Sequence, residues 1–277
     1  MNWRLIHYRP YSAFENMAID EAIFRETIRH QKPPTLRFYG WHPAAVSIGY
    51  FQDLIQEINI DRCRLSGVDI VRRMTGGKAV YHRDEVTYSL VAGKSEKRFP
   101  HHIIRTYEKI SLCLASGLSH LGIKSQLAET KTGNPTRTRD MASACFSAPS
   151  GNELIVDGKK ICGSAQTRTQ GGFLQHGSLL LTFDPVETAA LILLPYASEP
   201  SEKLRGSVTA VNEIIPLPVS AEALAAVLEK GFMDELGIRL TEETLTPAEK
   251  ALSSQLVKKY QSDAWNWERK KETGKSG

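Results

Sequence analysis

Two glycine-centred segments, far apart in the chain, carry residue types that acyl-transfer chemistry uses. The first is RRMTGGKAVYH at residues 72–82, and the second is KKICGSAQ at residues 159–166. In each segment, small residues and a basic side chain stand at the end of a β-rich run. Glycine lets the backbone approach a ligand closely, and consecutive amides can hold a carbonyl oxygen or an anion. The two segments therefore predict a backbone that closes around an acyl or acyl-phosphate ligand.

A cysteine in the polar loop between these segments is the candidate nucleophile. Cys145 lies in the stretch ACFSAPS, which has neither helical nor strand periodicity. A structural cysteine usually hides on an apolar face, as we expect for Cys113. A loop cysteine near basic residues is better suited to act as a thiolate. Cys162 competes for this role, but burial in a strand is the ordinary explanation for its position.

The paired lysines of the second segment offer a cation to the site. Lys159 and Lys160 alternate along the strand, so one faces inward if the other faces solvent. A buried lysine beside a carbonyl would stabilise a developing oxyanion or lower the pKa of the cysteine. Two solvated hairpin lysines are the competing interpretation, which the small residues from Gly163 onward disfavour.

The first segment also has a simpler interpretation, because Gly76-Gly77 alone is typical of a hairpin turn. The neighbouring Arg72-Arg73 and His82 favour a ligand site instead. The segment is not a phosphate-binding P-loop, since Ala79 follows Gly77-Lys78 and no glycine stands five residues before Gly77. His176 could bind substrate, although a single strand histidine is more often a satisfied structural residue.

Composition limits the classes to which this protein belongs. The chain has 277 residues, 41% of them hydrophobic and 24% charged, which is ordinary for a globular protein. Its net charge of +4 suits an acidic protein partner but falls short of a dedicated nucleic-acid binder. No apolar run is long enough for a membrane helix, and the N-terminus lacks a secretory pattern. The four cysteines show neither zinc-ligand nor disulfide spacing, so the cytoplasm is the expected compartment.

The elements that must position these residues are strands in the middle of the chain with helices around them. Ser12 and Glu15 form a capping box that predicts a helix ending before Pro33-Pro34. Periodicity predicts further helices at 102–121, 221–236 and 247–260. Short β-like runs are predicted at 35–39, 45–50, 69–73, 78–82 and 86–92. The class is therefore α+β, with a mixed sheet flanked by helices.

The second half of the chain is expected to form a hairpin and then a broken strand. Residues 153–156 and 160–167 flank Asp157-Gly158, a pair that tolerates the positive φ angles of a tight turn. A strand at 173–183 follows, interrupted at His176-Gly177. Residues 129–141 form a long polar loop that leads to Cys145. We expect a catalytic domain over 1–240, and a short helical extension with a charged tail over 241–277.

These segments resemble the lipoate/biotin protein ligase and octanoyltransferase superfamily. The resemblance rests on residues 72–82, 158–166 and 175–180, and further on the stretches RFYGW (37–41), SIGYFQ (47–52), CFSAPS (145–150) and SDAWN (262–266). These stretches are similar to those of the cysteine-dependent octanoyltransferases of Gram-positive bacteria. The resemblance runs in order through nearly the whole chain, from Trp3 to Trp267.

The resemblance implies a biotin/lipoate ligase-like catalytic domain with a sheet around an acyl tunnel. Cys145 would be the nucleophile, and Lys160 would lie near the thioester carbonyl. The residues that would shape the pocket are Arg73, Gly76, Gly77, His82, Gly163, Ser164, Ala165, His176 and Gly177. The implied donor is octanoyl-acyl carrier protein, and the implied acceptor is a lysine of the glycine cleavage H protein or another lipoyl domain. Neither a metal nor a nucleotide cofactor is required, and a monomer is the default expectation.

Two alternatives remain open on the sequence. In an ATP- and magnesium-dependent lipoate ligase, the same pocket would make lipoyl-adenylate and Cys145 would be incidental. Such ligases tend to carry Asn-Asp ahead of the hairpin, where this chain has Asn152-Glu153, so Glu153 could still hold a metal. The other alternative is a binding protein that keeps the acyl pocket without catalysis, against which the presence of both Cys145 and Lys160 argues.

Overall fold

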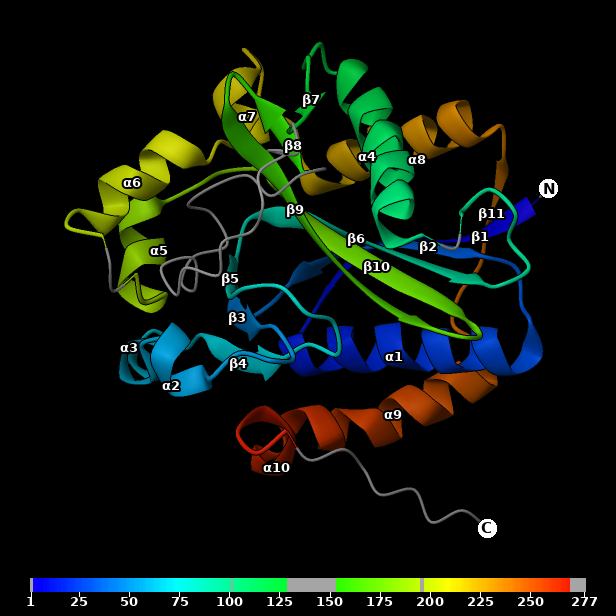
Figure 1. Cartoon of the computed structure of the whole chain (residues 1–277), viewed down its shortest axis with the longest axis horizontal. Coiled ribbons are helices and arrows are strands. Elements are labelled where there is room, and N and C mark those ends of the chain that lie inside the picture. The colour runs from blue at the N-terminus through cyan, green and yellow to red at the C-terminus, as the bar shows by residue number, and fades with distance from the viewer. Residues whose placement is uncertain (1, 101, 129–152, 195–196, 270–277) are drawn as a thin grey trace.

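A mixed sheet of eight strands forms the centre of the molecule, and a smaller sheet of three strands lies beside it (Figure 1). The computed structural model describes residues 2–100, 102–128, 153–194 and 197–269. In spatial order the large sheet consists of β11 (Arg239–Glu242), β1 (Asn2–Tyr11), β2 (Thr35–Trp41), β6 (Glu85–Gly93), β10 (Gly172–Leu180), β9 (Lys159–Thr169), β8 (Leu154–Val156) and β7 (Gln126–Leu127). The small sheet consists of β4 (Asp69–Arg72), β3 (Ala45–Ile48) and β5 (Val80–His82).

Helices cover both faces of the large sheet. The helices of the described residues are α1 (Ala13–His30), α2 (Leu54–Glu57), α3 (Ile60–Leu65), α4 (Ile103–Ser119), α5 (Pro185–Leu191), α6 (Pro200–Ser207), α7 (Val211–Ile214), α8 (Ala221–Leu236), α9 (Pro247–Gln261) and α10 (Asp263–Asn266). Helices α4 and α8 pack together on one face and α1 packs on the other, with α9 against the outer side of α1. The predicted α+β class with a mixed, helix-flanked sheet is confirmed.

Several local signals in the sequence correspond to elements of the structure. The side chain of Ser12 accepts from the Glu15 amide, and the Glu15 carboxylate accepts from the Ser12 amide, which starts α1. Asp157 and Gly158 have φ angles of 48° and 77°, as a tight two-residue turn between β8 and β9 requires. Helix α8 spans the predicted residues 221–236.

The predicted interruption of a strand at His176-Gly177 is wrong. Strand β10 pairs without a break with β6 on one side and with β9 on the other, through both residues. The glycine is required by packing between strands, since a Cβ on Gly177 would lie 2.5 Å from Ser164 Oγ and 2.7 Å from Tyr88 Cε1. Glycine often interrupts a strand, but Gly177 continues β10 and leaves room for the side chains of Ser164 and Tyr88.

The C-terminal helices are tied to the sheet and to α1 by buried polar contacts. Glu249 of α9 binds the guanidinium of Arg4 through both carboxylate oxygens, each at 2.8 Å. Asn266 of α10 accepts from the Arg72 amide at 2.8 Å, and the Arg72 side chain donates to the Asn266 carbonyl. The division at residue 240 stays a prediction, but the described residues beyond it pack directly on elements of the catalytic fold. None of the helices in the described part of the chain is long and apolar enough to cross a membrane.

Candidate functional site

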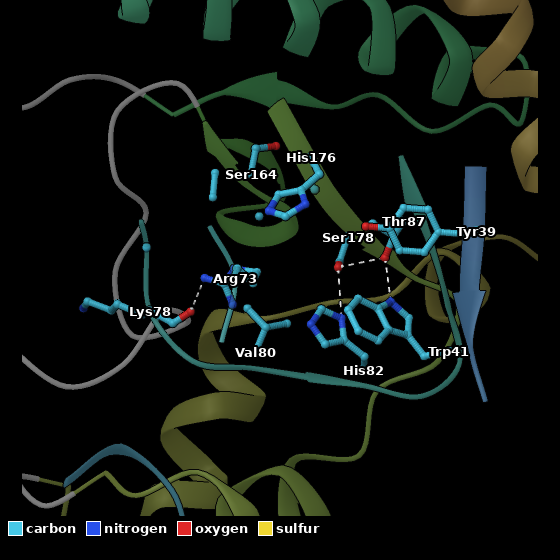
Figure 2. A pocket seen from close by; sticks show the side chains of 14 residues that line it. Tyr39, Trp41, Arg73, Lys78, Val80, His82, Thr87, Ser164, His176 and Ser178 are labelled. Carbon is cyan, nitrogen blue, oxygen red and sulfur yellow. Dashed lines mark hydrogen bonds between the residues drawn. The ribbon is translucent and has the colours of Figure 1, made fainter. Parts of the chain in front are cut away.

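One narrow cavity of about 40 Å³ brings together most of the predicted site residues. Eight of the predicted residues line it: Arg73, Gly77, His82, Gly163, Ser164, Ala165, His176 and Gly177. They come from the loop after β4, from β5 and from the β9–β10 pair. Figure 2 shows Arg73, His82, Ser164 and His176 among the side chains around the cavity. Gly76 and Lys160 do not line this cavity, and Cys145 lies outside the described residues.

A chain of hydrogen bonds behind the cavity holds Arg73 and His82 in place. Glu85 Oε1 lies 2.9 Å from Nδ1 of His82, whose Nε2 lies 2.6 Å from Ser47 Oγ. Because a carboxylate only accepts, Nδ1 of His82 is the donor to Glu85, and Nε2 shares a hydrogen bond with the Ser47 hydroxyl. Arg73 Nη1 donates to the same Ser47 Oγ at 2.6 Å. Arg73 Nη2 donates to the carbonyl oxygens of Gly76 and Lys78, so the hydrogen-bond network extends from the buried Glu85 carboxylate to the glycine loop.

Trp41 forms a flat apolar wall of the cavity. Its ring stacks on the imidazole of His82, with centroids 3.9 Å apart and an angle of 13° between the planes. Trp41 Nε1 donates to Thr87 Oγ1 at 2.9 Å, and Ser178 Oγ lies 3.3 Å from both Thr87 Oγ1 and His82 Nδ1 (Figure 2). The polar atoms of these residues bond to one another, and they leave ring faces and methyl groups for a ligand.

A second buried network fixes His176. Its Nε2 lies 2.8 Å from Thr75 Oγ1, and its Nδ1 lies 3.4 Å from Asp20 Oδ2. Asp20 is held in turn by Arg37 at 2.7 Å and by the hydroxyl of Tyr39 at 3.0 Å. Burial lowers the pKa of His176 despite the adjacent carboxylate, so the imidazole is neutral near pH 7. Burial alone would raise the pKa of Asp20, but the charge of Arg37 brings it below its usual value.

The two glycines of the first segment differ in what they require. Gly77 has a φ of +90°, a backbone conformation that residues with a Cβ rarely adopt, and a Cβ there would lie 3.2 Å from Arg73 Nη2. A Cβ on Gly76 would meet no atom within 4 Å. The glycine loop also fits against Gly49, whose missing Cβ would stand 1.9 Å from the Gly77 carbonyl oxygen. Gly77 is therefore the position at which glycine is needed.

Alternation predicts that one lysine of the pair faces inward, and the structure shows that Lys160 is the buried one. Its side chain is 1% exposed, and Nζ donates to Glu153 Oε1 at 2.6 Å. The ammonium group lies over the bare Cα of Gly163, where a Cβ would stand 3.1 Å from Nζ. Since Gly163 lines the cavity, this cation lies beside the cavity wall. The carboxylate of Glu153, a candidate metal ligand on the sequence, forms this ion pair.

The cysteines of the described residues are all buried, which argues against Cys162 as the nucleophile. Burial raises the pKa of Cys63 to about 11 and that of Cys162 to about 12, and it raises that of Cys113 still further. Such thiols stay protonated near neutral pH and are weak nucleophiles. The assignment of Cys145 stays a prediction, and burial makes Cys162 the weaker of the two candidates.

Several residues of the site were not singled out from the sequence. They are Tyr39, Trp41, Ser47, Thr75, Lys78, Val80 and Ser178, together with the buried acidic residues Asp20 and Glu85. An available signal was the pair Asp20-Glu21, because charged residues in the middle of an apolar helix stripe are unusual unless they are paired. Thr75 and Lys78 lie in the glycine loop between β4 and β5, and the remaining residues lie in ordinary strand patterns and join the site through tertiary contacts.

Comparison with known proteins places this geometry in a family. Residues 12–233 match the model of the lipoyl protein ligase A/B catalytic domain. The octanoyltransferase LipM of Kyrpidia tusciae is 40% identical over 270 residues, covering 96% of this chain and 98% of that protein. The octanoyltransferase LipM of Staphylococcus aureus is 38% identical, covering 95% of this chain and 97% of that protein.

Solved structures agree on the fold. A bi-partite lipoate protein ligase from Thermoplasma acidophilum, reported with its E2 lipoyl domain, superimposes with a TM-score of 0.83 at 26% identity, covering 99% of this chain and 100% of that one. Lipoate-protein ligase A bound with ATP gives a TM-score of 0.81 at 27% identity, covering 96% and 99%. The matched domain, the relatives of nearly equal length and the common fold all point to one family. This chain belongs to the lipoyl protein ligase A/B catalytic domain family.

Proposed function

We propose that this enzyme transfers an octanoyl group from octanoyl-acyl carrier protein, through a thioester on Cys145, to a lysine of a lipoyl-accepting protein. The observation that carries the proposal is the apolar-faced cavity between the glycine loop and β9–β10, in a chain about 40% identical to octanoyltransferases over nearly its whole length. The polar side chains around the cavity bond to one another, which leaves a pocket suited to an uncharged aliphatic chain. The acceptor is the glycine cleavage H protein or another lipoyl domain, and the reaction takes place in the cytoplasm.

The reaction proceeds in two exchanges. The thiolate of Cys145 attacks the carbonyl carbon of the donor thioester; the new carbon–sulfur bond forms, and the phosphopantetheine thiol leaves and takes up a proton. The amine of the acceptor lysine then attacks the acyl-enzyme, so that an amide forms, the bond to Cys145 breaks and a proton is released. A thioester intermediate is nearly isoenergetic with the donor, whereas amide formation is downhill.

Lys160 is the residue that we propose to assist both steps. Its ammonium lies beside Gly163 at the cavity wall, where a cation would stabilise the oxyanion of each tetrahedral intermediate. A nearby cation also favours the thiolate form of a cysteine. Glu153 fixes the position of this ammonium through the 2.6 Å contact.

The ATP-dependent lipoate ligase is the second candidate, since a ligase solved with ATP has the same fold. In this chain the Glu153 carboxylate, the candidate metal ligand, forms an ion pair with Lys160. A ligase would need ATP and free lipoate and would tolerate alanine at Cys145.

Intact-mass spectrometry separates these functions. The protein is mixed with octanoyl-acyl carrier protein without ATP, and wild type is compared with Cys145→Ala. We expect a hydroxylamine-labile octanoyl adduct on wild type only, and transfer of that group when the H protein is added. Transfer that depends on ATP, magnesium and free lipoate, and that survives Cys145→Ala, would establish the ligase instead. A wild-type protein that binds the carrier but is never acylated under either condition would establish a non-catalytic binder.

A further inference from the structure

A second hollow, of about 610 Å³, adjoins the acyl cavity on the other side of the glycine loop. Gly77 and Ala165 line the acyl cavity, whereas their chain neighbours Gly76 and Gln166 line this hollow. Its lining residues come from α1, from the end of β9, from the start of α4 and from α9 and α10, elements that can be located in Figure 1. We call it the basic groove and define it by Arg25, Phe51, Met74, Ile103, Arg168 and Lys259.

Apolar side chains in this groove are unusually exposed. Phe51 is 77% exposed and Ile103 is 50% exposed, although they belong to segments far apart in the chain. The ring of Phe51 stands edge-on against that of Tyr50, with centroids 5.0 Å apart. Large apolar side chains that converge on a hollow rimmed by polar groups are typical of protein interaction sites.

The charge of the groove selects the partner. Among the described residues that line it, three side chains are basic and only Glu21 is acidic. Glu21 binds Lys259 Nζ at 2.6 Å and the hydroxyl of Tyr260, and it also pairs with Arg25. Lys259 Nζ also lies 3.8 Å from the ring centroid of Trp265, so this ammonium contacts both a carboxylate and an aromatic ring. Such a surface is complementary to an acidic segment with apolar side chains between its carboxylates.

We infer that the basic groove docks the acidic carrier protein that delivers the octanoyl thioester, an inference that rests on the proposed function. A carrier brings its acyl group on a long phosphopantetheine arm, so it must dock beside the acyl cavity and not over it. The groove meets this requirement, since it shares the glycine loop with the cavity. An acceptor lysine has a much shorter side chain and is expected to approach the reacting atoms directly.

The first test measures binding without catalysis. Octanoyl-acyl carrier protein is titrated into Cys145→Ala protein carrying either Phe51→Ser with Arg25→Gln, or the matched surface changes Leu65→Ser with Arg205→Gln. Leu65 is 83% exposed and Arg205 58% exposed, and neither lines the groove. We expect at least tenfold weaker binding for the groove variant and no change for the control. Equal binding by both variants, or no binding of the carrier even without the substitutions, would overturn the inference.

The second test separates the donor from the acceptor and the groove from the chemistry. With Cys145 present, the groove variant should form the octanoyl-enzyme from octanoyl-N-acetylcysteamine, a thioester without a carrier, within twofold of the wild-type rate. With the carrier donor, its KM should rise at least tenfold. A rise in the KM for the H protein alone would assign the groove to the acceptor and overturn the inference. Failure of wild type to form an adduct from either donor, with carrier binding still lost in the groove variant, would reject the proposed function and keep the docking site.

Discussion

The buried Cys162 thiol should be almost entirely protonated, and therefore unreactive, near neutral pH. Burial raises its pKa from 9.0 to about 12, against the smaller opposing effects of Ser164 and Lys160. At pH 8 a thiol with a pKa of 9.0 is ~10% thiolate, whereas a thiol with a pKa of 12 is ~0.01% thiolate. The reactive form is therefore reduced about a thousandfold.

Access lowers the reactivity of Cys162 further. Its side chain is 3% exposed in strand β9, between β8 and β10, so a reagent reaches it only after local opening of the sheet. Cys63 and Cys113 are fully buried as well. We therefore expect the native protein to react with iodoacetamide at Cys145 alone. Cys162 should react at least about a thousandfold more slowly than a free thiol, and Cys63, whose pKa is raised to about 11, at least about a hundredfold more slowly.

The assay follows alkylation by intact mass at pH 8, with glutathione in the same tube as the reference thiol. Wild type should gain one label at a rate within tenfold of glutathione, and Cys145→Ala should gain none in that time. Both proteins should be labelled at every cysteine in guanidinium, which shows that each thiol is detectable. Peptide mapping then identifies the labelled residue.

One result would refute this reasoning. If Cys162 in the native protein were alkylated within tenfold of the glutathione rate, or if it carried the octanoyl group in Cys145→Ala, burial would not be controlling its chemistry. The choice of nucleophile between the two cysteines would then be reversed. The matched variant Cys162→Ala, which should keep full acyl-enzyme formation, tests the same point from the other side.

Three further predictions follow from the site and from α1. Gly77→Ala should lower kcat/KM about tenfold or more, because the positive φ at this position strains a residue with a Cβ by about 1–3 kcal/mol. The kcat/KM of the control variant Gly76→Ala should stay within about threefold of wild type, and steady-state kinetics compares the two variants. Lys160→Met should reduce the free energy of unfolding, measured in urea, by about 3 kcal/mol because the Glu153 carboxylate loses this partner. Adding Glu153→Met should restore part of the lost stability, whereas additive losses in the double variant would contradict the coupling. Burial acts to raise the pKa of Glu21, but the charge of Lys259 brings this pKa below the usual 4.5 in the folded protein. Ionised Glu21 therefore contributes to stability above pH 4.5, and this contribution is lost as the pH falls through the lower folded-state pKa. Thermal unfolding from about pH 5 to pH 3 should therefore show a smaller loss of stability for Glu21→Gln than for wild type, and parallel curves would count against this account.

Features encoded by neighbouring residues could be predicted from the sequence. The capping box of Ser12 and Glu15 begins α1, and Asp157-Gly158 makes the turn between β8 and β9, because the groups that bond or turn lie within a few residues of each other. Helix α8 follows from its apolar periodicity for the same reason. The two glycine-centred segments could likewise be identified by residue type alone, since small residues beside cations are rare in strands built only for packing.

Features that depend on distant partners were decided only by the tertiary structure. Strand β1 has no simple alternation and forms because β2 and β11 pair with it in parallel, although β11 is more than two hundred residues away. Gly177 continues a strand that it was expected to break, because Ser164 and Tyr88 occupy the space above it. The acyl cavity arises in the same way: Trp41 and His82 stack, and Asp20 meets His176, only after strands and helix from separate parts of the chain are packed. Local propensity selects the elements, but burial and hydrogen bonding between remote segments determine which side chains face one another in the site.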